Sequence, residues 1–209
     1  MLKIGKFILG PLSTNGYFVY EEEEKKAVFF DPADAGAHVY EKLKKEGIEV
    51  IAIYLTHGHF DHMQGAEELR KLTGAKIYAL DEEEEICKDS YLNLSANWSR
   101  TACVIEPDAY LHDGDVCEEA GMKFCVIATP GHTKGSCAFY FEEDGVLVNG
   151  DTLFEESTGR TDFPTGSMST LIRSIKDKLF VLPDDVKVFS GHGDMTTIGH
   201  EKKYNPFVQ

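Results

Sequence analysis

The sequence predicts an α/β protein built from two β-sheets with helices on their outer faces, and two observations lead to this prediction. Apolar runs typical of strands alternate along the chain with segments of helical periodicity. Histidines and aspartates come directly after several of these runs, which places polar side chains at the ends of strands. At 209 residues the chain has the length of one domain and contains no linker-like stretch, so a single domain over residues 1–209 is expected.

The first half of the chain is expected to begin as an antiparallel meander and to continue with alternating helices and strands. Strands are predicted over residues 7–9, 17–20, 27–30, 50–55 and 76–79, and helices over residues 38–45 and 63–72. The run at 50–55 is continuous and rich in β-branched and aromatic residues, as in a strand buried on both faces. Residues 82–100 are expected to be partly helical. The near-helical spacing of Tyr91, Leu94 and Trp98 favours core packing, and a loop that covers a site is the alternative.

The second half of the chain is expected to contain more strands than helices. Strands are predicted over residues 110–111, 122–128, 137–141, 146–149 and 186–190. One amphipathic helix is predicted over residues 169–179, because its apolar side chains fall on one face. No element is predicted for the tail after His192, and His200 in that tail is interpreted as structural, whereas His38 and His112 are expected at the surface.

Composition excludes several classes of function. The formal net charge of −15 and the isoelectric point near 4.9 argue against nucleic-acid binding, which needs clustered lysine and arginine. No apolar run approaches the ~20 residues of a membrane span, and the N-terminus does not resemble a signal peptide, so no membrane partner and a cytoplasmic location are expected.

The five cysteines include no Cys-x-x-Cys pair and are expected to be free thiols in a reducing compartment. The acidic runs at 21–24 and 81–85 are interpreted as solvated charges without chemistry.

One short stretch after the predicted strand at 50–55 carries the densest chemistry in the chain. His57, His59, Asp61 and His62 place three imidazoles and a carboxylate within six consecutive positions. Imidazole and carboxylate are ligands of zinc, and also of cobalt, manganese and iron. Four donors this close are too many for one tetrahedral ion that also binds ligands from elsewhere, so the stretch indicates two neighbouring metal ions.

Three further donors each follow a strand of their own. His132 comes after the strand at 122–128, Asp151 after the strand at 146–149, and His192 after the strand at 186–190. The expected cofactors are therefore two divalent metal ions. Zinc is the first expectation, and iron or manganese are alternatives because histidine and carboxylate ligands discriminate poorly among these metals.

This order of donors resembles that of the metallo-β-lactamase-fold hydrolases, in which His-x-His-x-Asp-His is followed by a later His, an Asp and a last His. Residues 129–133, 150–154, 159–164 and 190–193 look like hydroxyacylglutathione hydrolase (glyoxalase II) and its short bacterial relatives. The resemblance implies the αβ/βα four-layer sandwich of that superfamily. It also implies that one metal is held by His57, His59 and His132, that the other is held by Asp61, His62 and His192, and that Asp151 bridges the two.

The predicted function is a binuclear metallohydrolase that cleaves small thioesters, such as S-D-lactoylglutathione or a related compound. Two metals ~3.5–4 Å apart can share a hydroxide, because each lowers the pKa of bound water. Asp61 is assigned a catalytic role besides its role as a ligand. A thiolate leaves without a strong acid, which favours thioesters. Two divalent ions against Asp61, Asp151 and one hydroxide leave one positive charge, so an anionic small-molecule substrate is expected.

The resemblance implies a C-terminal helical domain that helps to grip glutathione in glyoxalase II, and no counterpart of it is expected here from the short stretch after His192. Lys134 and Arg160 are therefore the candidate substrate-binding residues, because they lie next to the ligand loops in sequence. The alternatives are that Arg160 pairs with Asp162 to brace its own loop and that Lys134 is a solvated turn residue.

Other activities of the superfamily fit this sequence less well than the hydrolase. A persulfide dioxygenase with one iron on a two-His-one-Asp set is the main alternative, and the intact loop around His192 favours the two-metal hydrolase. A β-lactamase is expected to carry an export signal, and a ribonuclease of this fold is expected to be larger and more basic. A non-catalytic binding module is expected to have lost ligands, and none is missing here.

Overall fold

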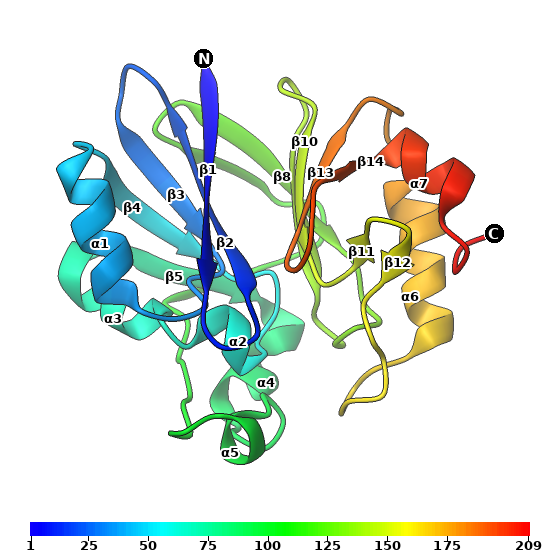
Figure 1. The fold of residues 1–209 in the computed structure, drawn as a ribbon, viewed down its shortest axis with the longest axis horizontal. Coiled ribbons are helices and arrows are strands. Elements are labelled where there is room, and N and C mark those ends of the chain that lie inside the picture. The colour runs from blue at the N-terminus through cyan, green and yellow to red at the C-terminus, as the bar shows by residue number, and fades with distance from the viewer.

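The computed structural model describes residues 1–209 and consists of two six-stranded sheets that face each other. Helices α1 and α3 cover the outer face of one sheet, and helices α6 and α7 lie outside the other (Figure 1). The order of layers is therefore helix, sheet, sheet, helix, and the predicted αβ/βα four-layer sandwich is confirmed. No helix of the structure is both long enough and apolar enough to cross a membrane.

The first sheet is formed by the first half of the chain, in the order β1-β2-β3-β4-β5-β6. Strands β1 to β3 are antiparallel, which confirms the predicted meander, and β3 to β6 are parallel. The strands are β1 (Leu2–Leu9), β2 (Thr14–Glu21), β3 (Lys26–Phe30), β4 (Glu49–Tyr54), β5 (Lys76–Leu80) and β6 (Ala109–Leu111). The helices of this half are α1 (Gly36–Lys45), α2 (Phe60–Met63), α3 (Ala66–Thr73), the 3-10 turn η1 (Asp81–Glu83), α4 (Glu84–Lys88) and α5 (Ser95–Trp98).

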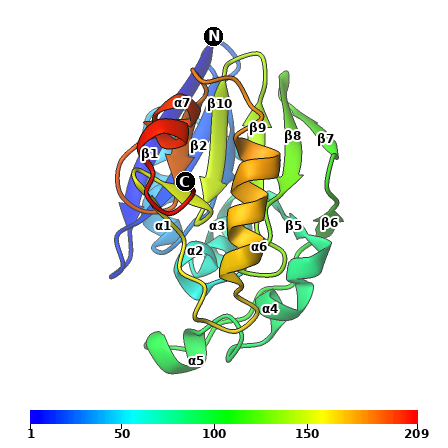
Figure 2. The ribbon, with the colours of Figure 1, turned by 90° about the vertical axis from the view of Figure 1, so that its right-hand side faces the viewer.

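The second sheet is formed by the second half of the chain, in the order β14-β13-β10-β9-β8-β7. Only the β10–β13 pair is parallel. Helix α6 lies across the face of this sheet, in front of β8 to β10 in Figure 2. The strands are β7 (Val116–Glu119), β8 (Met122–Ala128), β9 (Cys137–Phe141), β10 (Val146–Gly150), β13 (Lys187–Ser190) and β14 (Thr196–Thr197), with a separate hairpin of β11 (Leu153–Phe154) and β12 (Ser157–Thr158). The helices are α6 (Met168–Ser174), the π-helical turn η2 (Ile175–Leu179) and α7 (Ile198–Tyr204).

Aromatic side chains fill the layer between the two sheets. Phe30 of the first sheet contacts the rings of Phe124, Phe139 and Phe141 of the second, and all four side chains are buried. Truncating such a ring to Ala typically costs 3–5 kcal/mol. This layer holds the two sheets together, and the loops at one end of both sheets are thereby placed opposite each other.

Two predicted helices are interrupted in the structure. The predicted helix at 63–72 is divided into α2 and α3, because the Gly65 N–H donates to the Pro32 carbonyl at 2.8 Å and not to a carbonyl of the preceding helical turn. The predicted helix at 169–179 widens into a π-helical turn, in which the Phe180 N–H donates to the Ile175 carbonyl.

Two other segments differ from what the sequence indicated. Tyr91 and Trp98 are exposed rather than packed in the core, and only Leu94 of the three is buried. The tail after His192, where no element was predicted, forms β14 and α7. Helix α7 starts at a capping residue, because the Thr197 side chain accepts a hydrogen bond from the His200 N–H.

Candidate metal centre

The loop after β4 presents the first four donors from a fixed backbone. Asp31, which follows β3 on the neighbouring strand, is buried and accepts hydrogen bonds from the Thr56 N–H at 2.8 Å and the Thr56 hydroxyl at 2.6 Å. Helix α2 begins directly after His59, so Asp61 and His62 lie on its first turn. A buried strand and a helix therefore bracket the donors and limit their movement.

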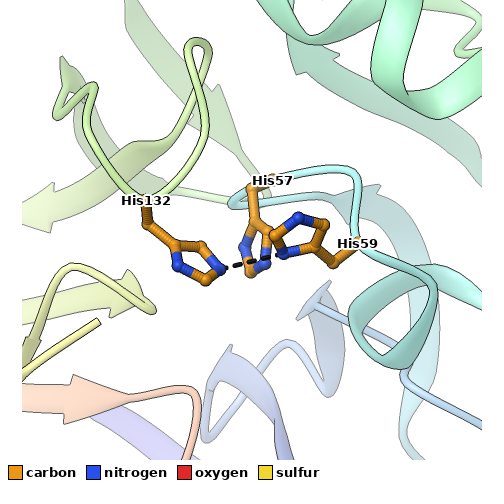
Figure 3. A group of neighbouring side chains, drawn as sticks. All are labelled: His57, His59 and His132. Carbon is orange, nitrogen blue, oxygen red and sulfur yellow. Dashed lines mark hydrogen bonds between the residues drawn. The ribbon is translucent and has the colours of Figure 1, made fainter. Parts of the chain in front are cut away.

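Three imidazoles form the first group of possible metal ligands. His57 and His59 come from the loop after β4 and His132 comes from the loop after β8, and their side chains converge on one point (Figure 3). The ligand atoms of the three residues lie within 4.8 Å of one another. The Nδ1 atom of His59 is 2.9 Å from the Nε2 atom of His132.

The second group combines two imidazoles with a carboxylate. Asp61, His62 and His192 also offer ligand atoms within 4.8 Å of one another. The Nε2 atom of His192 is 3.3 Å from the Asp61 Oδ2 atom. Asp151 lies between the two groups, with Oδ1 at 3.3 Å from the His62 Nε2 atom and Oδ2 at 3.6 Å from the His132 Nε2 atom. Its carboxylate is therefore placed where it could bridge two ions.

The donor atoms of the cluster fit a pair of divalent cations. Buried polar atoms in folded proteins almost always have a partner. The Nε2 atoms of His57, His59 and His62 and the Oδ1 atom of Asp151 are buried and have no hydrogen-bond partner. Imidazole nitrogen and carboxylate oxygen in groups of three match the ligands that zinc and similar metals prefer.

The protonation of the first group suits metal binding at neutral pH. Burial lowers the pKa of His59 to about 3, and burial together with the neighbouring imidazoles holds the pKa of His57 well below its usual range. Burial also lowers the pKa of His132. These rings are therefore neutral near pH 7, which is the form that binds metal.

The carboxylates of the cluster are ionised. Burial acts to raise the pKa of Asp151, but the neighbouring histidines, His62 first, outweigh it and lower that pKa. At Asp61 the neighbouring histidines likewise outweigh the effect of burial and lower the pKa. In His62, the charges of Asp151 and Asp61 outweigh burial and raise the pKa.

Residues behind the donors fix the orientation of each ring or carboxylate. The Nδ1 atom of His62 is 2.9 Å from the Asp31 Oδ2 atom, and the Nδ1 atom of His132 is 2.7 Å from the Arg160 carbonyl oxygen. The Thr14 hydroxyl donates to the Asp61 Oδ2 atom at 3.1 Å. Such outer partners set which ring nitrogen faces the metal. The sequence reasoning did not identify Asp31 or Thr14, because their partners are distant in the chain.

The loop that carries His192 is held by the N-terminal hairpin. The Asn15 side-chain amide donates to the carbonyl oxygens of Ser190 at 2.9 Å and Gly193 at 3.0 Å, and the Tyr17 hydroxyl donates to Ser190 at 2.8 Å. Strand β2 of the first sheet therefore positions a donor of the second sheet.

Glu83 corrects the interpretation of the acidic run at 81–85. Its side chain is fully buried, and its Oε1 atom accepts a hydrogen bond from the Gly58 N–H at 2.9 Å, between His57 and His59. Burial raises the pKa of Glu83 to about 7, against the opposing effects of the Gly58 N–H and the Thr133 hydroxyl. The other four acidic residues of the run are exposed, as expected.

A cavity of about 400 Å³ opens over the donor cluster. Arg160 is part of its lining, whereas Lys134 is not; the Lys134 ammonium pairs with Glu85 on the surface. Arg160 forms two hydrogen bonds of 2.7 Å with Asp162, as the bracing alternative expects. The substrate-binding roles of Lys134 and Arg160 stay predictions. The apolar lining consists of Leu12, Phe60, Leu94, Trp98, Phe154 and Phe163.

The remaining predictions for histidine and cysteine agree with the structure. His38 and His112 are exposed, and His200 pairs with Glu156 away from the donor cluster. All five cysteines are free thiols, and Cys87 and Cys137 are buried.

Comparison with known proteins identifies the family. Residues 9–192 match the model of the metallo-beta-lactamase superfamily. The chain belongs to this superfamily.

Three relatives within the superfamily are informative. The chain is 34% identical over 193 residues to the hydroxyacylglutathione hydrolase GloC of Haemophilus influenzae, which covers 90% of this chain and 89% of the relative. It is similar to the crystal structure of the BLEG-1 B3 metallo-beta-lactamase, with a TM-score of 0.94, 36% identity and 99% of both chains covered. It is also similar to TTHA1623 in a di-iron-bound form, with a TM-score of 0.87, 32% identity, and 97% of this chain and 99% of that chain covered.

Proposed function

We propose that the protein is a binuclear metal-dependent hydrolase that cleaves small thioesters. The observation that carries this proposal is the arrangement of the donors in two groups of three, with the Asp151 carboxylate between them. His57, His59 and His132 would hold one ion, and Asp61, His62 and His192 would hold the other. The relationship to a hydroxyacylglutathione hydrolase supports the choice of thioesters.

The protein's own residues would bind the metal ions and orient the water that attacks the reacting carbonyl. Two bound divalent ions would supply Lewis acidity, which acidifies water and polarises a carbonyl group. The Asp61 carboxylate, fixed through Oδ2 by Thr14, would orient the attacking water through Oδ1. The water gives up a proton to solvent, its oxygen bonds to the acyl carbon, and the carbon–sulfur bond breaks. The sulfur leaves with the electron pair as a thiolate, so the products are a carboxylate and, once solvent protonates the sulfur, a thiol.

The lining of the cavity favours a leaving group that needs no proton donor. Apart from the donor residues, the only polar side chains that line the cavity are Ser157, Thr158 and Arg160, and none of them is a general acid near pH 7. A thiolate leaves readily, because a thiol such as cysteine has a pKa of about 8.5. An amide nitrogen must be protonated as it leaves. The site therefore suits thioesters better than amides.

The charge of the site suits an anionic substrate. Two divalent ions would exceed the charge of Asp61 and Asp151 even with one hydroxide present, so the reacting end of the cavity would be positive. We propose an anionic small-molecule thioester as the substrate. The five free cysteines are consistent with a reducing compartment, and we propose the cytoplasm as the location.

The proposed metal is zinc, with iron or manganese as the alternatives. The donor set of imidazoles and carboxylates accepts all three metals. A relative with 32% identity was crystallised with two iron ions, which keeps iron as a specific alternative.

A β-lactam is the second candidate substrate. It is favoured by the similarity to the BLEG-1 B3 metallo-beta-lactamase over 99% of both chains. Cleavage of a β-lactam breaks an amide bond, so the missing proton donor in the cavity lowers the expected rate relative to a thioester.

One experiment tests these assignments together. Metal content is measured on protein purified from its native host, and turnover is measured with thioesters of glutathione, coenzyme A and N-acetylcysteamine, with a β-lactam, and with glutathione persulfide. Two metal ions per chain and turnover of a thioester are expected. One ion per chain, together with sulfite from glutathione persulfide, would instead support the mononuclear iron dioxygenase. Absence of thioester turnover in metal-loaded protein would refute the proposal.

A further inference from the structure

One wall of the cavity over the donor cluster consists of aromatic rings that reach into solvent. Trp98 is the only tryptophan of the chain, and 57% of its surface is exposed. Its ring packs edge-on against Phe163, with the centroids 5.7 Å apart. Phe163 in turn packs edge-on against His59, with the centroids 5.8 Å apart. The rings therefore form a continuous surface from a predicted metal ligand to the mouth of the cavity.

The segment that carries Trp98 is attached to the ligand loop. The Phe60 N–H, between His59 and Asp61, donates to the Asn93 carbonyl at 2.9 Å. The Asn93 side-chain amide and the Ser95 hydroxyl both donate to the Cys103 carbonyl, at 2.8 Å and 3.0 Å. These bonds close the segment into a loop of fixed shape. Trp98 is thus held over the cavity in advance of binding, which reduces the entropy lost when a ligand contacts it.

Arg160 completes this wall. Its guanidinium lies over the Phe163 ring, with the central carbon 3.9 Å from the ring centroid. Its two hydrogen bonds to Asp162 hold the guanidinium in this place. Leu12, Leu94 and Phe154 extend the apolar lining. A large exposed apolar surface next to a polar site is typical of a binding surface.

We infer that Trp98 and Phe163 are specificity-determining residues that bind an apolar group of about the size of an aromatic ring in the substrate. This inference rests on the proposed thioester hydrolase and specifies its substrate class: an anionic thioester that carries an apolar group away from the reacting carbonyl. A substrate that is polar throughout leaves the Trp98 surface in water and gains nothing from it.

The inference is tested by binding, with two ligands that cannot be hydrolysed. (Benzylthio)acetate and (methylthio)acetate share a thioether and a carboxylate, and differ only in the group on sulfur, which is benzyl in one and methyl in the other. Each is titrated into metal-loaded protein while the emission of the single tryptophan is recorded. The benzyl compound is expected to bind at least ~10-fold more tightly. It should also shift the emission to shorter wavelength, because it removes Trp98 from water.

Variants assign this preference to the wall. Phe163→Ala and Trp98→Ala are each expected to reduce the preference to less than about threefold, measured by calorimetry, with metal content unchanged. Tyr91→Ala is the matched control, because Tyr91 is an aromatic residue of the same segment, is 69% exposed and does not line the cavity. It should keep the full preference.

Equal affinity for the two ligands would overturn the inference, as would a preference that survives Trp98→Ala or is lost in Tyr91→Ala. These outcomes are independent of hydrolysis, because neither ligand has a bond that the proposed enzyme cleaves. A preference for the benzyl compound without thioester turnover would refute the proposed function and leave this inference standing. Thioester turnover without that preference would refute this inference and leave the proposed function standing.

Discussion

The imidazole of His62 and the carboxylate of Asp31 form a buried pair, with the His62 Nδ1 atom 2.9 Å from the Asp31 Oδ2 atom. This contact leaves the His62 Nε2 atom facing Asp151 and the donor cluster. Asp31 also accepts both hydrogen bonds from Thr56, the residue before His57. A single carboxylate therefore orients one donor and holds the backbone that carries another.

Replacing Asp31 should weaken both metal binding and folding. Asp31→Ala leaves the Thr56 N–H and the His62 Nδ1 atom buried without partners, so the free energy of unfolding is expected to fall by roughly 3 kcal/mol. Metal affinity is expected to fall ~10–100-fold, as is usual for outer-shell partners. Denaturant unfolding and competition with a chelator measure the two effects. Asp34→Ala is the control, because Asp34 bonds only to the neighbouring Ala35 N–H. A metal affinity of Asp31→Ala equal to that of Asp34→Ala would refute the orienting role of Asp31.

Asp151 should matter more for metal content than any single histidine. It lies between the two donor groups, so Asp151→Ala removes an oxygen donor from both predicted ions, whereas His57→Ala or His192→Ala removes a donor from one. Metal per chain after dialysis, measured by elemental analysis, is expected to be lowest for Asp151→Ala. Equal losses in all three variants would count against a bridging carboxylate.

Arg160 and Lys134 should differ in their effect on substrate binding. Arg160 lines the cavity, and Lys134 pairs with Glu85 outside it. Arg160→Ala is expected to raise KM for anionic thioesters by about 5-fold with kcat and metal content unchanged, because binding common to substrate and transition state is lost. Lys134→Ala is expected to raise KM less. A less stable Arg160→Ala protein with an unchanged KM would instead assign Arg160 to bracing its loop with Asp162.

Glu83 should make stability depend on pH near neutrality. Its carboxyl group has a pKa of about 7 in the folded chain against an ordinary value of 4.5. Between these values the folded state binds more protons than the unfolded state, so the free energy of unfolding falls as pH rises through this window, by roughly 3 kcal/mol in total. Glu83→Gln cannot ionise and is expected to remove that part of the slope.

Urea unfolding between pH 4.5 and 8 measures this effect as the difference between wild type and variant. Glu85→Gln is the control, since Glu85 belongs to the same acidic run and is exposed. If the free energy of unfolding changed with pH in the same way for wild type and Glu83→Gln, the buried carboxyl group would not titrate in this range.

The sequence predicted the sheets and the donors better than the residues that support them. The strands and the seven donors stand out locally, because apolar runs end in histidine or aspartate. Asp31 and Glu83 do not stand out. Glu83 is one of five consecutive acidic residues, and only the tertiary structure buries it against Gly58. A role that depends on a partner 25 positions away has no local signal.

Trp98 was predicted wrongly for a related reason. Its spacing from Tyr91 and Leu94 fits a helix, but Leu94 has a φ of 70°, which breaks any helix at that point. Helix α7 could have been found from its capping residue Thr197. Local sequence patterns thus locate helices and strands, whereas tertiary packing determines which exposed residues face a cavity.

The division of the chain into two consecutive sheets has a consequence for biosynthesis. The first sheet ends with β6 at Leu111, and by then the ribosome has made four of the seven donors. His132, Asp151 and His192 all belong to the second sheet, and neither group of three is complete without one of them. Neither donor group can therefore form from the first sheet alone, so the predicted metal ions would be fully coordinated only after the strands of the second sheet have been made and folded.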